Sequence, residues 1–178
     1  QNPMVLLTLF TSMYLHGGWA HLIGNMLYLW IFGDNVEDSM GHGGFFVFYT
    51  LSGIIASLLQ VAAAASSTTP MIGASGAIAG VLGAYLLIFP QARVSTLVPS
   101  FYFYRVVWLP SIIVLGGWFL IQLLNGIASI NVNMQTGGVA WWAHIGGFAA
   151  GMLLHRIFRK DDYEPPGRRL SERQRRYD

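Results

Sequence analysis

Apolar residues fall into long runs along the chain, and short clusters of Gly, Pro, Asn, Asp, Ser and Thr interrupt them. A helix that spans a bilayer needs about 20 mostly apolar residues. The runs predict five transmembrane helices, at about 20–33, 45–65, 75–89, 106–125 and 141–158. Pro90 ends the third helix, because proline lacks the amide hydrogen that a helix interior requires. We therefore expect an all-α polytopic membrane protein with a helical-bundle domain over residues 1–158.

The two ends of the chain differ from this pattern. Residues 3–15 are apolar but too few to span a bilayer, so residues 1–19 are expected to form a membrane-associated loop. Residues 159–178 are polar and rich in Arg. We expect a basic tail there, either solvated or in contact with anionic lipid headgroups.

Composition agrees with a membrane protein. The chain is 54% hydrophobic and only 10% charged, whereas soluble domains carry about 25% charged residues. It contains no cysteine, which excludes a thiol nucleophile and a cysteine-based metal site.

The placement of charge predicts the orientation. The ten basic residues occur only at Arg93, at Arg105 and from Arg156 onward. Alternation of the five helices brings these positions to one side, which the positive-inside rule makes cytoplasmic. The turns "SSTTPMIGA" and "NVNMQTGGV" then lie on the outer side, and neither has a basic residue. The tail would thus be cytoplasmic.

Four polar side chains stand out inside the apolar helices: Ser75, His144, His21 and Asn25. Such residues are rare in a bilayer and are candidates for function. At 1.5 Å per residue along their helices, Ser75, His144 and His21 all lie roughly 20 Å from the cytoplasmic boundary of the membrane. Asn25 follows His21 by four residues and shares its helix face.

These residues suit nucleophilic catalysis. Serine is a poor nucleophile until a base within hydrogen-bond reach takes its proton, and a neutral His144 can do so. No Asp or Glu occurs between Asp38 and Asp161, so the arrangement would be a Ser–His dyad without a carboxylate. Ser75 begins a helix, where free N–H groups and the dipole favour an oxyanion. His21 and Asn25 would be further donors.

Small residues flank the dyad. Gly76 and Gly80 form one small-xxx-small pattern, and Gly147 and Gly151 form another. Such patterns allow helix backbones to approach closely. We expect the third and fifth helices to make this contact.

Three segments, "HGGWAHLIGNMLYLWIFGDNVED", "GASGAIAGVLGAY" and "AHIGGFAAG", resemble the signatures of rhomboid intramembrane serine proteases in order and spacing. The resemblance implies that Ser75 is the nucleophile and His144 the base. It places His21 and Asn25 at the oxyanion, together with Gly73 and the Ser75 backbone N–H.

The resemblance also implies supporting residues. His16 is similar to a structural loop residue, and Glu37 to a glutamate that ties a helix end to its neighbours. Gly76, Gly147 and Gly151 would support the helix contact.

The family resemblance implies a serine endopeptidase that cleaves transmembrane segments of membrane proteins, in a bacterial inner or plasma membrane. The active site would open to the outer side. It implies no cofactor, no metal and no nucleic-acid partner. The family core has six helices, so a first helix is expected in a longer precursor, a disordered part or a separate piece. Ala79 stands where some members carry a tyrosine against the base.

Three alternatives compete with this interpretation. A catalytically inactive relative would bind membrane clients without cutting them, but such relatives typically lose the Ser or the His. A channel or transporter could relay protons through His144 and His21, yet the lower halves of these helices are apolar. A zinc enzyme would favour His-Glu-x-x-His, which His16-x4-His21 matches poorly.

Overall fold

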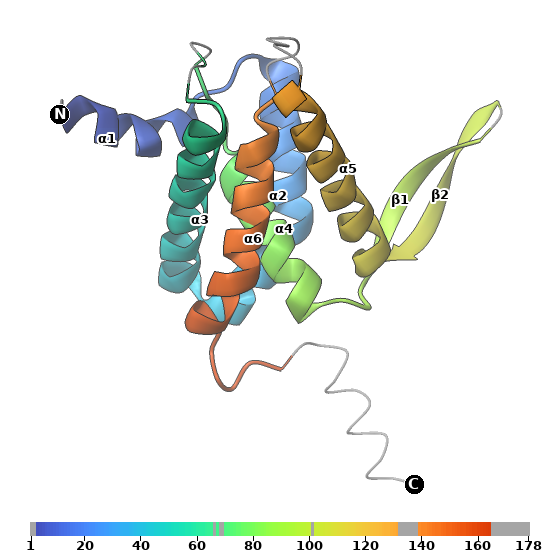
Figure 1. The fold of residues 1–178 in the computed structure, drawn as a ribbon. Coiled ribbons are helices and arrows are strands. Elements are labelled where there is room, and N and C mark those ends of the chain that lie inside the picture. Colours follow the sequence, from blue (N-terminus) through green and yellow to red (C-terminus); the bar gives the residue numbers. More distant parts are fainter. Residues whose placement is uncertain (1–2, 66, 68–69, 101, 132–138, 165–178) are drawn as a thin grey trace, which may run out of the picture.

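A computed structural model describes residues 3–65, 67, 70–100, 102–131 and 139–164. Helices make up most of it, as predicted, and a β-hairpin projects from the bundle (Figure 1). The elements in chain order are α1 (Pro3–Thr11), the 3-10 turn η1 (Ser12–Tyr14), α2 (Trp19–Met40), α3 (His42–Ala63), α4 (Ser75–Ile88), β1 (Arg93–Ser100), β2 (Phe103–Pro110), α5 (Ser111–Asn131) and α6 (Trp141–Phe158).

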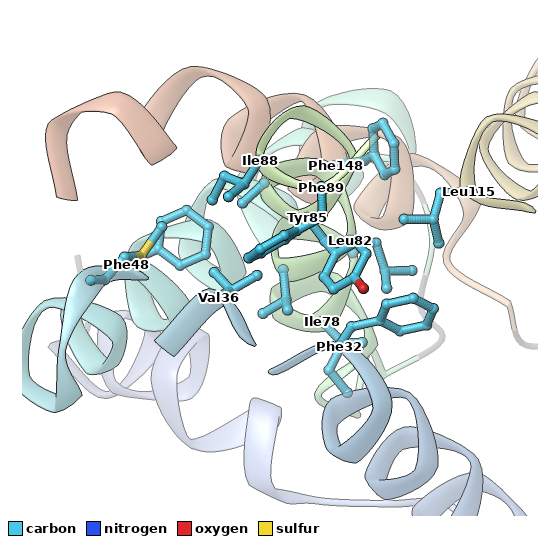
Figure 2. Packing of buried hydrophobic residues seen from close by; sticks show 14 of the residues in the cluster. Phe32, Val36, Phe48, Ile78, Leu82, Tyr85, Ile88, Phe89, Leu115 and Phe148 are labelled. Atoms are coloured by element: carbon cyan, nitrogen blue, oxygen red, sulfur yellow. The ribbon is translucent and has the colours of Figure 1, made fainter. Parts of the chain in front are cut away.

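Helix α4 is the centre of the bundle. Ten of its 14 residues are buried, and it packs against α2, α3, α5 and α6. Its sequence "SGAIAGVLGAYLLI" is apolar on every side, which is typical of a helix surrounded by others. Figure 2 shows Leu82 and Tyr85 of α4 within the same cluster as Val36 of α2 and Phe148 of α6.

Two of the outer helices meet a simple criterion for a membrane span. His42–Ala63 and Ser111–Ile130 are long and apolar enough to cross a bilayer, and only 28% and 22% of their most apolar windows are buried inside the structure. Exposed apolar faces of this size indicate contact with lipid or with another apolar surface. Helix α4 is apolar but shorter. The other three of the five expected spans stay a prediction.

The predicted helix at 106–125 is wrong at its start. Residues 106–110 belong to β2, which pairs antiparallel with β1 in the register Val94↔Leu109 and Thr96↔Val107. Helix α5 begins only at Ser111 and continues to Asn131. Short apolar runs rich in Val, Trp and Tyr fit a strand as well as a helix, so periodicity alone could not distinguish them.

The hairpin leaves the bundle and returns to it at one point. The Ser111 amide donates to the Ala92 carbonyl over 2.8 Å, and the Ser111 hydroxyl donates to the Phe89 carbonyl over 2.5 Å. These bonds fix the start of α5 against the end of α4 without using the strands between them.

The first two predicted helices have other bounds in the structure. Helix α2 is longer and continues past residue 33 to Met40, whereas α3 is shifted: it begins at His42 and not at 45, and ends at Ala63 and not at 65. A single residue separates them: Gly41 has φ +76°, a conformation that glycine adopts easily. Gly43 and Gly44 do not break α3, so the glycine-rich sequence predicted a loop that is longer than the real one.

The remaining boundaries need little revision. Helices α4 and α6 coincide with the expected 75–89 and 141–158 to within one residue. Residues 1–19 contain α1, which projects sideways near one end of α3 in Figure 1. Most of the expected tail, 165–178, lies outside the described residues.

Candidate active site

Ser75 and His144 form a hydrogen bond across the bundle. The Ser75 hydroxyl and Nε2 of His144 are 2.9 Å apart, although 69 positions separate the two residues in the chain. Ser75 is the first residue of α4, and His144 is in the first turn of α6. Both side chains are partly buried.

Glycines bring these two helices into backbone contact. A methyl group added to Gly147 would overlap the carbonyl oxygen of Gly76, and one added to Gly151 would overlap the carbonyl oxygen of Gly80. Any larger residue at these positions must separate α4 from α6. Because the serine side chain has only one carbon, the Ser75–His144 bond depends on this short separation.

The second ring nitrogen of His144 also has a partner. Nδ1 lies 2.8 Å from Oε1 of Gln122 on α5. The Trp118 ring, one turn earlier on α5, lies 5.7 Å from the imidazole centroid. The Trp141 ring meets the imidazole edge to face at 6.4 Å. Sequence reasoning missed Gln122 and Trp118, although Gln122 is a lone amide in the apolar run "WFLIQLL", the kind of signal that singled out Ser75.

His21 and Asn25 lie beside the loop that leads into α4. Gly73 in this loop has φ +120°. A Cβ atom there would lie 2.6 Å from Cε1 and 2.7 Å from Nε2 of His21, and 3.7 Å from Nδ2 of Asn25. Glycine is therefore required at position 73 for both its backbone angle and its space. The Gly73 amide donates to the Ser12 carbonyl over 3.0 Å, which anchors the loop to η1.

His21 and Asn25 each carry a hydrogen-bond donor next to this loop. The Gly17 amide donates to Nδ1 of His21 over 3.4 Å, so a neutral His21 carries its proton on Nε2, the nitrogen next to Gly73. Nδ2 of Asn25 is buried and has no hydrogen-bond partner in the described part of the chain. Unsatisfied buried donors are rare and call for an explanation. Here they would suit an oxygen that gains negative charge.

The predicted supporting residues occupy three separate places. His16 contacts His21 edge to face at 5.2 Å. Glu37 lies at the far end of α2, where Oε1 is 2.5 Å from Nδ1 of His42 at the start of α3. Gly76 and Gly147 lie in the helix contact described above.

His155, near the end of α6, lies apart from these residues and is only 6% exposed. Its Nδ1 donates to the Met152 carbonyl over 2.8 Å.

The site is neutral apart from its histidines, because no acidic residue occurs between Asp38 and Asp161. Within the part of the chain that the structure describes, no three His, Asp or Glu side chains are grouped so that they could hold a metal ion. The arrangement can do one kind of chemistry: activate a hydroxyl and stabilise an oxyanion beside it.

The fold and the site together define the class of this protein. It is a helical membrane protein whose candidate site is a hydrogen-bonded Ser–His pair. A family model, the Rhomboid domain, matches residues 4–161. The chain therefore belongs to the rhomboid family, which confirms the resemblance found in the sequence.

Relatives from mitochondria and from a bacterium support the assignment to this family. The chain is 31% identical over 148 residues to Rhomboid protein 1, mitochondrial, of Saccharomyces cerevisiae, covering 80% of this chain and 39% of that protein. It is 32% identical over 149 residues to RHOMBOID-like protein 6, mitochondrial, of Arabidopsis thaliana (82% and 41%). It is 35% identical over 145 residues to Rhomboid protease GluP of Bacillus subtilis (82% and 24%). The chain thus spans well under half the length of these relatives.

Proposed function

We propose that this protein is an intramembrane serine endopeptidase that hydrolyses peptide bonds in or near transmembrane segments of other membrane proteins. The observation that carries the proposal is the 2.9 Å hydrogen bond between Ser75 and His144. The family includes a relative named as a protease, GluP. The buried Asn25 amide, which has no hydrogen-bond partner in the described part of the chain, and the His21 ring both lie next to Gly73 and add to its support.

The first half of the reaction forms an acyl-enzyme. The Ser75 oxygen bonds to the carbonyl carbon of the substrate, and Nε2 of His144 takes the hydroxyl proton. The carbonyl oxygen becomes an oxyanion, which the His21 ring, the Asn25 amide and the Ser75 backbone N–H stabilise. The C–N bond then breaks, and His144 returns the proton to the leaving amine.

The second half releases the product. A water molecule attacks the ester carbon, and His144 takes one of its protons. The bond between the Ser75 oxygen and the acyl carbon breaks, and the serine regains its proton from His144. Both halves need only a neutral His144 at the start, which a site without carboxylates favours.

The substrate class follows from the setting of the site. An intact transmembrane helix hides its peptide bonds in its own hydrogen bonds, so we expect substrates with a helix that unwinds easily. The family resemblance also implies small residues at the cut. The basic residues support a cytoplasmic tail and a site that opens to the outer side of a bacterial inner or plasma membrane.

Cleavage of a synthetic transmembrane substrate in proteoliposomes tests the proposal. The wild type should cut it, whereas Ser75→Ala and His144→Ala should lose at least about 10³-fold in rate. Ser57→Ala is a matched control, because Ser57 is buried in α3 and bonds only to the Gly53 carbonyl in its own helix. Equal cleavage by all four proteins would refute the mechanism. Binding without cleavage by the wild type would instead identify an inactive, client-binding member.

A further inference from the structure

Gln122 is the one polar side chain that reaches the candidate dyad from α5. It is 6% exposed, and its Oε1 lies 2.8 Å from Nδ1 of His144. The hydroxyl of Ser75 lies 2.9 Å from the other ring nitrogen. The imidazole is therefore held at both nitrogens, by different helices.

The donor and the acceptor in each hydrogen bond can be assigned by starting from the Trp118 carbonyl, which can only accept. The Gln122 amide group donates through Nε2 to the Trp118 carbonyl, over 3.4 Å. A carbonyl only accepts, so this bond keeps the Gln122 nitrogen turned toward Trp118 and its oxygen toward His144. Since an amide oxygen also only accepts, Nδ1 of His144 must donate. The neutral ring then carries no proton on Nε2, which is free to accept from Ser75.

This proton arrangement is the one that a general base requires. A neutral histidine has two tautomers, and only the form protonated on Nδ1 can take the serine proton through Nε2. In water the two forms interchange, and nothing at Ser75 itself selects between them, because a hydroxyl can either donate or accept. Selection must come from the Nδ1 side.

We propose that Gln122 is a positioning residue that fixes the orientation and the tautomer of His144, as the third member of a Ser–His–Gln chain. It acts through His144 and does not touch the substrate carbonyl. Being neutral, it cannot offset the charge of a protonated imidazole as a carboxylate would, so its contribution is geometric. This inference rests on the proposed function, because it assigns a role in the same reaction.

The structure also explains why α5 can supply this contact. Trp118 and Gln122 are one turn apart, so they lie on the same helix face. Trp118 contacts the imidazole ring at 5.7 Å between centroids, while Gln122 contacts its Nδ1 edge. One face of α5 thus limits both the tilt and the rotation of the ring.

Two substitutions separate positioning from packing. Gln122→Met keeps the size of the side chain but removes the acceptor, and Gln122→Glu keeps an acceptor oxygen. If Gln122 positions His144, the Met variant should lose about 10- to 100-fold in kcat and in the rate of fluorophosphonate labelling, part of the roughly 10²- to 10⁴-fold that a positioned base contributes. KM should change less than about twofold, and the Glu variant should stay within about tenfold of the wild type.

A packing role predicts the reverse order, because an apolar Met fits a buried site better than Glu. Asn125→Leu is the matched control: Asn125 is an exposed amide of α5 that donates to the Ile121 carbonyl of its own helix. Wild-type rates in Gln122→Met, or an equal loss in Met and Glu variants, would overturn the inference.

Nitrogen NMR of the wild-type protein provides a readout that needs no substitution at Gln122. With ¹⁵N-labelled histidine, the His144 signals should show a proton on Nδ1, assigned through their loss in His144→Ala. A proton on Nε2 would overturn the inference even if Ser75 is labelled normally. Absence of labelling in the wild type would instead refute the proposed function, and the role of Gln122 with it.

Discussion

The buried amide of Asn25 would cost stability at rest and gain a partner in the proposed reaction. Its Nδ2 is buried and without a partner in the described residues, and an unsatisfied buried donor typically costs about 1–3 kcal/mol. The neighbouring His21 carries its ring proton on the side of Gly73. Donors that are unsatisfied at rest can bond to an oxyanion when it forms, so their cost becomes transition-state stabilisation.

Replacement of Asn25 by Leu should therefore affect rate and stability in opposite directions. We expect kcat to fall about 10²- to 10³-fold, as for loss of one oxyanion donor. The melting temperature in detergent should stay the same or rise, because the unsatisfied amide is gone. Asn35→Leu, near the far end of α2, is the control for a polar-to-apolar change in the same helix. Unchanged kcat in Asn25→Leu would exclude Asn25 from the oxyanion site.

Single residues of the site could be predicted from the sequence to different degrees. Ser75 and His144 were found because each is a polar residue in an apolar helix and both lie at the same depth. Gln122 carries the same signal, but its partner depends on the rotation of α5, which the sequence does not specify. The boundary of that helix was also misplaced, so its residues could not be placed by depth.

The Ser75–His144 hydrogen bond depends on the close contact between helices α4 and α6. Its glycines leave no room for a side chain: a Cβ on Gly147 would overlap a backbone oxygen, which cannot move away as a flexible side chain can. Close backbone approach is typical of helix pairs in membranes, where burial of apolar groups alone gives little driving force.

Gly147→Ala should thus destabilise the protein by about 1–3 kcal/mol, as expected for overpacking, and should lower activity through the longer Ser75–His144 distance. Thermal unfolding in detergent and substrate cleavage measure the two effects. Gly117→Ala on α5 is the matched control, because a Cβ there would meet no atom within 4 Å. Equal stability of the two variants would contradict the packing described for α4 and α6.

The β-hairpin is the element that sequence reasoning missed, and the structure suggests that the dyad does not need it. Ala92 and Ser111, on either side of the hairpin, are joined by a hydrogen bond of 2.8 Å. The strands pair with each other and pack mainly against α5. Their short, β-branched and aromatic sequence fits a strand as well as a helix, and Pro110 marks the end of β2, directly before α5 begins.

Replacement of residues 95–108 by Asn-Gly tests this independence. Val94 and Leu109 are paired across the hairpin, and Asn-Gly forms the tight turn that joins such a pair. We expect fluorophosphonate labelling of Ser75 at the wild-type rate and unfolding free energy within about 1 kcal/mol, within the range of changes that avoid core packing. Loss of labelling would show that the hairpin holds α5, and with it Gln122, in place.

At the scale of the whole molecule, the candidate site lies toward one end of the bundle. Ser75 and His144 begin α4 and α6, whose first turns lie at the end opposite to the root of the hairpin (Figure 1). Helices α3 and α5 carry exposed apolar faces. Because lipid would cover such faces in a bilayer, the proposed hydrolysis requires that water reach the dyad from that end.

Cysteine labelling tests the proposed orientation. The chain has no cysteine, so a single introduced thiol is unique. Val139→Cys and Asp161→Cys flank α6, and both positions are exposed. In intact cells that produce the protein, a membrane-impermeant maleimide should modify the first and not the second, because basic residues mark the cytoplasmic side. The opposite pattern would reverse the orientation, and modification of both would mean that α6 does not span.

The most direct measurement is the site of covalent modification by a fluorophosphonate. This reagent phosphonylates a serine only where a base activates its hydroxyl. After digestion of the labelled wild type, mass spectrometry should locate the adduct on Ser75, and His144→Ala should abolish it while leaving the protein folded. An adduct on another residue, or labelling of His144→Ala at the wild-type rate, would show that Ser75 and His144 do not form a working dyad.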